Sequence, residues 1–434
     1  MNFLYTQKIK MTKKIVLSFT LLVTGLLGFS QENTSSPYSY YGLGDVRFRG
    51  THDARAMGGL NITGDSISLN LQNPASYSRL YLTTFAVGGS SNFNNLKNNT
   101  TTEQAQRTSL DYLAVGIPMG KFGASFGLIP YSAVGYKINL RTTDENNILR
   151  NRQLLGSGNV NNFFVGGAYN YNQHLSFGFN IEYNFGVINN TSKQTMFDLN
   201  TNTIVQLGTK EENSYNISGF SYNLGILFNK KIQNNLNLYS SLTYRPKSEF
   251  KTNKTRNLSL IAFDNLGNEF QVTEPVEIEI PDENIVLPSK LSLGFGIGKT
   301  NTWMLGSEIS FSNSSKQNNL FIENSNSTYK NSQRYTIGGY YIPKYDSFNS
   351  YLSRVVYRAG FRYDTNGLVI NNQTINDYGM NFGLGLPLGV SKIDVGFEFG
   401  KRGTTSSGLI QENYFNLSIG LSLSDKWFKK TLID

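Results

Sequence analysis

Long stretches of this sequence alternate between apolar and polar residues with a period of two. One series near the C-terminus carries its apolar side chains at Phe415, Leu417, Ile419, Leu421 and Leu423. Similar series run through 175–185, 291–297 and 393–399. Because successive side chains of a β-strand point to opposite faces, each stretch would be apolar on one face only. The pattern therefore predicts an all-β protein, either a soluble sandwich or a transmembrane barrel.

Three further features favour the transmembrane barrel. The polar faces are rich in Gly, Ser and Asn with isolated charges, as expected of a crowded lumen. The connections alternate between long and short, which is typical of bacterial outer-membrane barrels. Aromatic residues gather where the strands end, as in the interfacial girdles of such barrels, at Tyr169, Tyr171, Phe228, Trp303, Tyr341, Trp427 and Phe428.

We predict a closed antiparallel barrel of fourteen strands within residues 81–434. The strands are expected at 81–92, 108–118, 122–140, 160–171, 174–189, 214–229, 235–250, 287–299, 302–312, 333–343, 351–363, 367–386, 390–400 and 411–424. Long loops rich in Asn, Thr and Ser are expected at 93–107, 141–159, 190–213, 251–286 and 313–332, and a short connection at 364–366. An even number of strands returns the C-terminus to the periplasmic side.

The first thirty residues have the pattern of a secretory signal peptide. A lysine-rich stretch from Lys8 to Lys14 precedes the apolar run Ile15–Phe29, and small residues then lead to a predicted cleavage site near Ser30 and Gln31. The run is too short to be expected as a membrane anchor. Met11 is a plausible translation start, and the pattern does not decide between it and Met1. The signal directs the chain to the cell envelope, and the barrel pattern predicts the outer membrane of a Gram-negative cell.

The composition argues against enzymatic, metal-dependent and nucleic-acid functions. The chain has 39 Lys and Arg against 30 Asp and Glu, but four of the lysines lie in the signal peptide and no basic block remains elsewhere. It has no cysteine and only two histidines, His52 and His174, neither of which has a recognisable catalytic spacing to a serine or carboxylate. We therefore predict no enzyme activity, no cofactor, no metal site and no nucleic-acid partner.

Residues 31–80 lack long alternation and would form a poor independent core. A fourteen-stranded barrel encloses space that something must fill, so we predict that this segment lies in the lumen as a hatch. Its charged residues Asp45, Arg47, Arg49, Asp53 and Arg55 would then need partners. The expected lumen charges on the strands are Glu182, Arg245, Glu308, Arg354, Arg358, Arg362, Asp377, Asp394 and Glu398. Such pairs could simply fasten the hatch or could mark a ligand site.

Several motifs occur in the order found in one family of outer-membrane barrels. A turn at Met57, Gly58 and Gly59 is followed by Asn73, Pro74 and Ala75 just before the first strand. The long third strand carries Pro130 between Ile129 and Tyr131. This arrangement, with the fourteen strands, resembles the FadL/TodX outer-membrane transport family over the whole mature chain. The segments 36–39 and 41–45 resemble the mature N-terminus of a Bacteroidota branch of these barrels.

The resemblance implies passive uptake of a hydrophobic small molecule through a hatch-gated lumen, with lateral exit to membrane lipid near Pro130. A proline in mid-strand removes one hydrogen-bond donor, which is consistent with a gap in the wall and equally with a simple bulge. The alternative is a non-transporting accessory subunit of a larger outer-membrane protein complex, either the outer-membrane protein assembly (BAM) machinery or type IX secretion. A continuous apolar pocket beside the third strand would favour transport, and a lumen closed by ion pairs would favour the accessory role.

Overall fold

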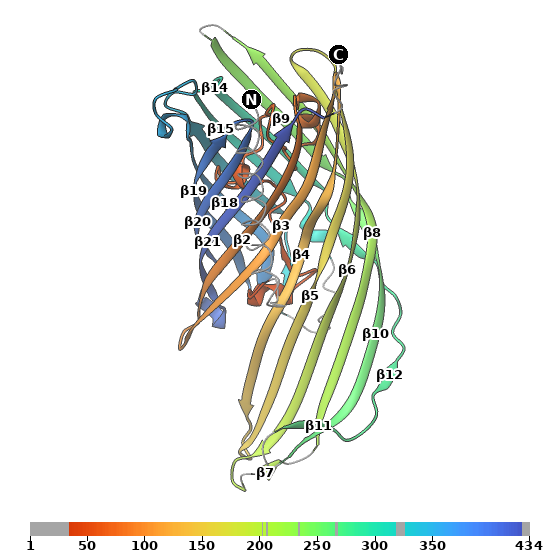
Figure 1. The fold of residues 1–434 in the computed structure, drawn as a ribbon. Helices are drawn as coiled ribbons and strands as arrows, with labels where there is room; N and C mark the ends of the chain where they lie inside the picture. Colours follow the sequence, from red (N-terminus) through yellow and green to blue (C-terminus); the bar gives the residue numbers. More distant parts are fainter. Residues whose placement is uncertain are drawn as a thin grey trace, which may run out of the picture. The chain divides into compact units, whose positions relative to one another are not determined.

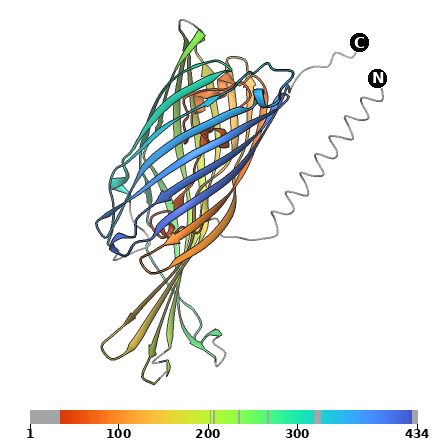
Figure 2. The same cartoon turned by 90° about the vertical axis from the view of Figure 1, so that its left-hand side faces the viewer.

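The protein is described by a computed structural model that covers residues 34–201, 203–204, 207–232, 235–264, 268–317 and 326–427. Fourteen antiparallel strands form a closed barrel, which confirms the predicted fold class (Figures 1 and 2). They are β2 (Thr83–Lys97), β3 (Thr102–Met119), β4 (Phe122–Thr143), β5 (Ile148–Asn170), β6 (Leu175–Asp198), β8 (Gly208–Lys231), β9 (Leu236–Arg245), β14 (Lys290–Lys299), β15 (Trp303–Ser312), β17 (Ser332–Tyr341), β18 (Val356–Ile370), β19 (Gln373–Leu388), β20 (Ser391–Arg402) and β21 (Gln411–Asp425). The signal peptide predicted at 1–30 lies outside the described residues.

Each strand pairs with its neighbour in the chain, and pairing between β2 and β21 closes the barrel. After β9, the chain continues through Pro246 and Lys247 into β10 (Ser248–Phe263), which extends the same barrel position and pairs with the outer half of β8. Short strands and turns complete the described part of the chain: β7 (Thr203–Ile204), β11 (Glu269–Gln271), β12 (Val276–Ile278), β13 (Ile285–Leu287), β16 (Ser327–Tyr329), η4 (Ser314–Lys316), η5 (Leu352–Arg354) and η6 (Ser406–Gly408).

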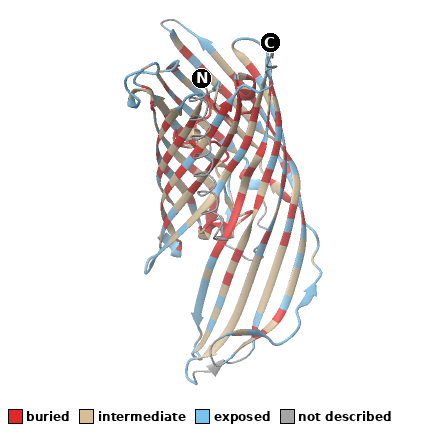
Figure 3. Cartoon of the chain, in the orientation of Figure 1, coloured by how far each residue is buried: buried red, intermediate tan, exposed pale blue. Residues whose placement is uncertain are grey.

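The apolar rows of the strands point outward, as the alternation predicted. On β6, Phe179 and Ile181 are 51% and 45% exposed, whereas Asn180 and Glu182 between and beside them are each 2% exposed. Figure 3 shows the same alternation of buried and exposed residues along the strands. An exposed apolar belt of this kind is stable only against lipid, so the barrel is of the outer-membrane type.

The strands on one side of the barrel are much longer than predicted. Strands β4, β5, β6 and β8 have 22, 23, 24 and 24 residues, whereas β14, β15 and β17 have 10 each. Most of 93–107, 141–159, 190–213 and the first part of 251–286 is therefore paired strand, and the prediction of long loops there was wrong. Since a tilted transmembrane strand needs only about 10 residues, roughly half of each long strand extends beyond the lipid.

The hairpin between β18 and β19 also lies elsewhere than predicted. The sequence suggested a connection at 364–366, but the turn is formed by Asn371 and Asn372, whose φ angles are 50° and 63°. Asparagine tolerates this left-handed conformation, which two-residue hairpin turns require. Gly367, with φ of 77°, lies instead in an irregularity where β18 and β19 lose their register. Because β18 and β19 stay paired up to this turn, the hairpin is long. The short connection at 364–366, which was the exception to the alternation of long and short connections, is therefore absent.

Residues 34–82 lie within the ring of strands, where Figures 1 and 2 show them as the red segment inside the barrel. We call this segment the plug. It contains η1 (Pro37–Tyr40), the short strand β1 (Asp45–Val46), one helical turn α2 (His52–Arg55) and η2 (Pro74–Arg79). Among the described residues, no helix is both long enough and apolar enough to span a bilayer.

Candidate functional site: the plugged lumen

The plug approaches the wall most closely at glycines that face the lumen. A side chain at Gly178 of β6 would overlap the backbone of Pro74 and Ala75, and one at Gly360 of β18 would overlap the backbone at Met57. Plug backbone would also be overlapped at Gly123 and Gly338, and the side chains of Asn73, Pro74 and Ile62 would be overlapped at Gly225, Gly294, Gly296 and Gly306. The glycines of the polar strand faces therefore act as docking positions for the plug.

The Met57, Gly58 and Gly59 turn needs glycine for conformational reasons as well. Gly58 and Gly59 have φ angles of 74° and 93°, which other residues rarely adopt. The turn follows directly on α2, whose last backbone hydrogen bonds run from Gly58 N to Arg55 O and from Gly59 N to Ala54 O. The turn thereby ends the helix and directs the chain back across the lumen.

The Asn73, Pro74 and Ala75 motif fixes the start of η2 against the wall. The Asn73 side chain accepts a hydrogen bond from Ala75 N at 3.1 Å, which caps η2, and its amide donates to Ile226 O of β8 at 3.1 Å. Pro74 occupies the first helical position, where its missing N–H costs nothing. Asn73 and Ala75 are completely buried. One side chain thus joins the plug to the barrel while it also stabilises the local turn.

Apolar side chains of the plug pack against the wall in four separate clusters. Leu43 packs against β4–β10 near Val134 and Phe250, and Leu69 and Tyr77 pack near Ile129. The other two clusters form around Tyr38 with Leu368, Ile370, Ile375 and Leu409, and around Met57, Leu60 and Ile62 with Tyr239 and Met304. Burying a side chain of this size contributes about 1.5–3 kcal/mol, so together the clusters oppose release of the plug.

Ion pairs between the plug and the wall supplement this packing. Arg49 pairs with Glu182 at 2.8 Å and Arg55 with Glu398 at 3.2 Å, as the sequence suggested. Three further pairs join plug charges to wall residues that the sequence analysis did not select: Asp45 to Arg402 at 2.7 Å, Asp53 to Lys392 at 2.7 Å and Arg55 to Asp111 at 3.3 Å.

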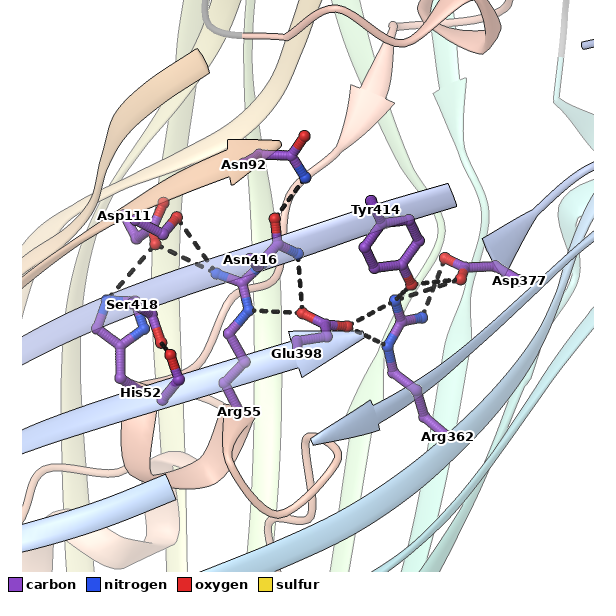
Figure 4. Close-up of polar contacts among 12 residues, drawn as sticks. His52, Arg55, Asn92, Asp111, Arg362, Asp377, Glu398, Tyr414, Asn416 and Ser418 are labelled. Atoms are coloured by element: carbon purple, nitrogen blue, oxygen red, sulfur yellow. Dashed lines mark hydrogen bonds and ion pairs between the residues drawn. The ribbon is translucent and has the colours of Figure 1, made fainter. Parts of the chain in front are cut away.

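Glu398 lies at the centre of the polar network that Figure 4 shows. Its carboxylate accepts from Arg55 of the plug, from Arg362 Nη2 of β18 at 2.9 Å and from Asn416 Nδ2 of β21 at 3.0 Å. Arg362 also pairs with Asp377 at 3.1 Å. With both carboxylate oxygens occupied and the side chain 5% exposed, Glu398 binds the plug to three strands at once.

The remaining predicted lumen charges have other positions. Arg358 of β18 and Asp394 of β20 pair with each other along the inner side of the wall at 2.8 Å. Arg245 and Glu308 line the cavity but form no ion pair among the described residues. Arg354 was wrongly placed on a strand: it lies in η5 before β18, over the ring of Tyr351.

The plug carboxylates lie close to wall cations, and this sets their ionisation. Burial alone would raise the pKa of Asp53, but the charges of Lys392 and Arg358 outweigh it and hold the pKa well below its usual value. The pKa of Asp45 is likewise lowered, because Arg402 and Arg47 more than offset the effect of burial. Both carboxylates therefore stay ionised at neutral pH and keep the ion pairs of the plug intact.

The wall is interrupted beside Pro130. Hydrogen bonding between β3 and β4 ends at the pair Leu113 and Leu128, and the outer part of β4 has no partner on β3. On its other side, β4 changes register with β5 between Pro130 and Ser132, so Tyr131 forms a bulge. Strand β1 of the plug occupies part of the free edge, with Asp45 opposite Ala133 and Val46 opposite Ser132. The proline thus lies at both a bulge and the end of a strand pairing.

The space left in the lumen is a polar cavity of about 410 Å³. Its lining includes arginines, carboxylates, serines and asparagines from the plug and from most of the strands. The side of the lumen next to Pro130 is filled by Leu43 and Tyr40 of the plug, which pack against Tyr136 and Val134 of β4. Among the described residues, no group of His, Cys, Asp or Glu side chains is arranged to hold a metal ion.

A sequence model of one protein family, named BamG, matches residues 11–434. The chain belongs to the BamG family. No protein of curated function matches it significantly in sequence.

Solved structures show that the BamG-family chain shares its fold with outer-membrane transport barrels. The Pseudomonas putida toluene transporter TodX superposes with a TM-score of 0.58 at 16% identity, covering 89% of this chain and 100% of that one. The Ralstonia pickettii toluene transporter TbuX gives 0.56 at 13% identity, covering 87% and 99%, and a Pseudomonas aeruginosa FadL homologue gives 0.54 at 11% identity, covering 87% and 98%. The resemblance to the FadL/TodX family is thereby confirmed for the fold.

Acidification is expected to loosen the plug of this BamG-family chain around His52. Burial lowers the pKa of His52 to about 4, although Asp111, whose Oδ2 lies 3.5 Å from Nε2, partly offsets this effect. Arg55 opposes the charged form, and Asp394 and Asp53 favour it. The released plug would have the ordinary pKa of 6.5 and would bind a proton first, so docking weakens as the pH falls from about 6.5 to 4, by about 3 kcal/mol in all.

Hydrogen exchange of residues 50–60, corrected for the intrinsic effect of pH, would measure this change. Exchange should rise between about pH 7.5 and 4.5 in the natural chain and stay nearly constant in His52→Gln, because glutamine does not titrate. An equal response of both proteins would show that His52 is not responsible.

Proposed function

We propose that this chain is a non-transporting accessory subunit of a larger outer-membrane protein assembly complex. The observation that carries the proposal is the closure of its lumen: the plug is bound by ion pairs from Asp45, Arg49, Asp53 and Arg55 and by four apolar clusters. A path for hydrophobic molecules would need a continuous apolar surface. The remaining cavity is lined mostly by polar groups instead.

Two further observations support this proposal. The family model carries the name BamG, which begins with the letters of the outer-membrane protein assembly (BAM) machinery. The long strands β4, β5, β6 and β8 also provide a paired surface beyond the lipid that transport through the lumen does not require. The apolar residues Phe270, Val272 and Val276 near the outer edge of β10 are 46–64% exposed. Exposed apolar groups outside the lipid are typical of protein contact sites.

Purification from native membranes tests the proposal. The tagged chain would be extracted in mild detergent, and its complexes would be separated by size and identified by mass spectrometry. We expect a stoichiometric complex that contains known outer-membrane assembly subunits. An unrelated barrel with the same tag and similar abundance serves as control. Recovery of the tagged chain as an isolated monomer, under conditions that keep other envelope complexes intact, would contradict the accessory role.

The second candidate is passive uptake of hydrophobic small molecules with lateral exit near Pro130. The end of pairing between β3 and β4 at Leu113 and Leu128 favours it, because plug residues rather than β3 occupy the edge of β4 beyond that point. In this function, movement of β1 away from β4 would open a path from the lumen to the lipid. The plug would then act as the hatch that the sequence analysis predicted.

A disulfide between β1 and β4 would separate the two candidates. The chain has no natural cysteine, and Val46 and Ser132 are directly paired residues, so Val46→Cys with Ser132→Cys can be oxidised to join the strands. If the chain transports, oxidation should reduce uptake of laurate or toluene into vesicles at least tenfold, and reduction should restore it. If the chain is an accessory subunit, the natural chain shows no uptake above that of empty vesicles. Each single-cysteine variant controls for the substitutions.

A further inference from the structure

Two cations in the lumen cavity lie side by side with no described acid at ion-pair distance. Arg245 is the last residue of β9 and Lys290 is the first of β14, and they are directly opposite each other in the ladder between these strands. Both line the polar cavity. Neither makes an ion pair or a side-chain hydrogen bond with any residue that the structure describes. Residues opposite each other in an antiparallel pair are about 4.5–5.5 Å apart at Cα, so the two like charges repel each other.

The acids whose charges act on these cations either pair with other bases or lie outside ion-pair distance. Glu182 pairs with Arg49 at 2.8 Å, and Asp364 pairs with Arg334 at 2.6 Å. Glu308 lines the same cavity and its charge acts on Lys290, but the two side chains are not within ion-pair distance. In this part of the lining, the cations Arg47, Arg49, Arg245, Lys290 and Arg334 outnumber the acids Glu182, Glu308 and Asp364, so an excess of positive charge remains.

We propose that Arg245 and Lys290 form a binding site for a small oxyanion, such as a phosphate or carboxylate group. A planar guanidinium beside an ammonium group suits the oxygens of such an anion. Hydroxyl groups are available from Ser292 and Ser310, whose Oγ atoms lie 2.7 Å apart and which line the same cavity. A fifth residue, Arg47, also lines the cavity and has a buried Nη2 atom without a hydrogen-bond partner.

The lining of the cavity limits the anion to a hydrophilic one. Thr243 and Ser292 are the next inward residues on the same two strands, and they are paired with each other in the ladder. Most of the other lining residues are polar or charged. An acyl chain attached to the anion would find no continuous apolar wall there. The site is independent of the accessory role proposed above, so a failure of one does not decide the other.

Calorimetric titration of the purified full-length chain with inorganic phosphate tests the site. We expect saturable binding to the natural chain and at least a tenfold loss of affinity in Arg245→Gln with Lys290→Gln. The matched control is Lys230→Gln with Lys231→Gln, which removes two positive charges at the exposed end of β8 and should bind phosphate as the natural chain does. Equal affinity in the natural chain and the Arg245 and Lys290 variant, or no binding at millimolar phosphate, would overturn the proposal.

Thermal unfolding shows whether a loss of phosphate binding in the variant comes from a folding defect. Because the two cations repel each other, the Arg245 and Lys290 variant in anion-free buffer should unfold at a temperature equal to or above that of the natural chain. Phosphate should raise the unfolding temperature of the natural chain only. A lower unfolding temperature of the variant, with no effect of phosphate on either protein, would show that the cations are structural. Laurate should bind no more tightly than acetate, and clearly tighter binding of laurate would contradict a hydrophilic ligand.

Discussion

Replacing Gly178 with valine is expected to displace η2 of the plug from the wall. A side chain at this position would overlap the backbone of Pro74 and Ala75, and backbone atoms cannot move aside as a flexible side chain can. Overpacking of this kind costs about 1–3 kcal/mol, and a contact with backbone belongs at the upper end of the range. Hydrogen exchange of residues 73–80 should therefore rise about 100-fold. Conductance in planar bilayers should rise with it as the lumen becomes open to ions.

The control for this prediction is Gly167→Val on the neighbouring strand β5. A Cβ there would meet only the ring of Phe179 at an ordinary 3.6 Å. It adds the same side chain to the same kind of strand, away from the plug. Unchanged exchange of 73–80 in Gly178→Val, in a barrel that folds normally, would mean that the plug does not dock at this glycine.

Replacing Glu398 with glutamine is expected to release α2 and the turn that follows it. The carboxylate is 5% exposed and pairs with Arg55 of the plug and Arg362 of the wall. Breaking a buried ion pair costs about 3–5 kcal/mol, and the lower end applies because Asp111 and Asp377 still accompany the two arginines. Exchange of residues 52–60 should increase about 100-fold, while strands far from the network, such as β6, should not change.

An exposed ion pair provides the comparison for this substitution. Lys247 and Glu249 lie 2.9 Å apart with side chains that are 52% and 50% exposed. Such a pair contributes at most about 1 kcal/mol, so Glu249→Gln should leave the plug and the barrel almost unaffected. If Glu398→Gln were equally neutral, the packing clusters alone would hold the plug and the ion pairs would have another purpose.

The sequence predicted the strands best where one of their faces meets lipid. On β6, the alternation of apolar and polar residues identifies 174–189, and the strand runs through it as Leu175–Asp198. The part beyond 189 was missed because it lies outside the lipid, where both faces are wet and the period-two signal disappears although the backbone still pairs. The same reason explains the error at 141–159, which the structure resolves into the ends of β4 and β5.

The plug contacts were predictable in kind but only partly in detail. The need of buried charges for partners was clear from the sequence, and Arg49 with Glu182 fulfils it. Lys392 and Arg402 could have been found, because they share the inward face of β20 with Asp394 and Glu398 at a spacing of two residues. Which acid meets which base depends on the path of the plug across the lumen, and this path is set by the glycine docking positions rather than by any local pattern.

The pairing of β1 with β4 couples movement of the plug to opening of the barrel wall. In a barrel whose plug made no backbone pairing with the wall, these two movements would be independent. Asp45 and Val46 belong to the plug by sequence, yet by hydrogen bonding they are part of the wall. Any displacement of Asp45 and Val46 toward the centre of the lumen must break their backbone pairing with Ala133 and Ser132. The edge of β4 is then exposed. Displacement of the plug and opening of the wall beside β4 would then occur together, so a change that favours one would also favour the other.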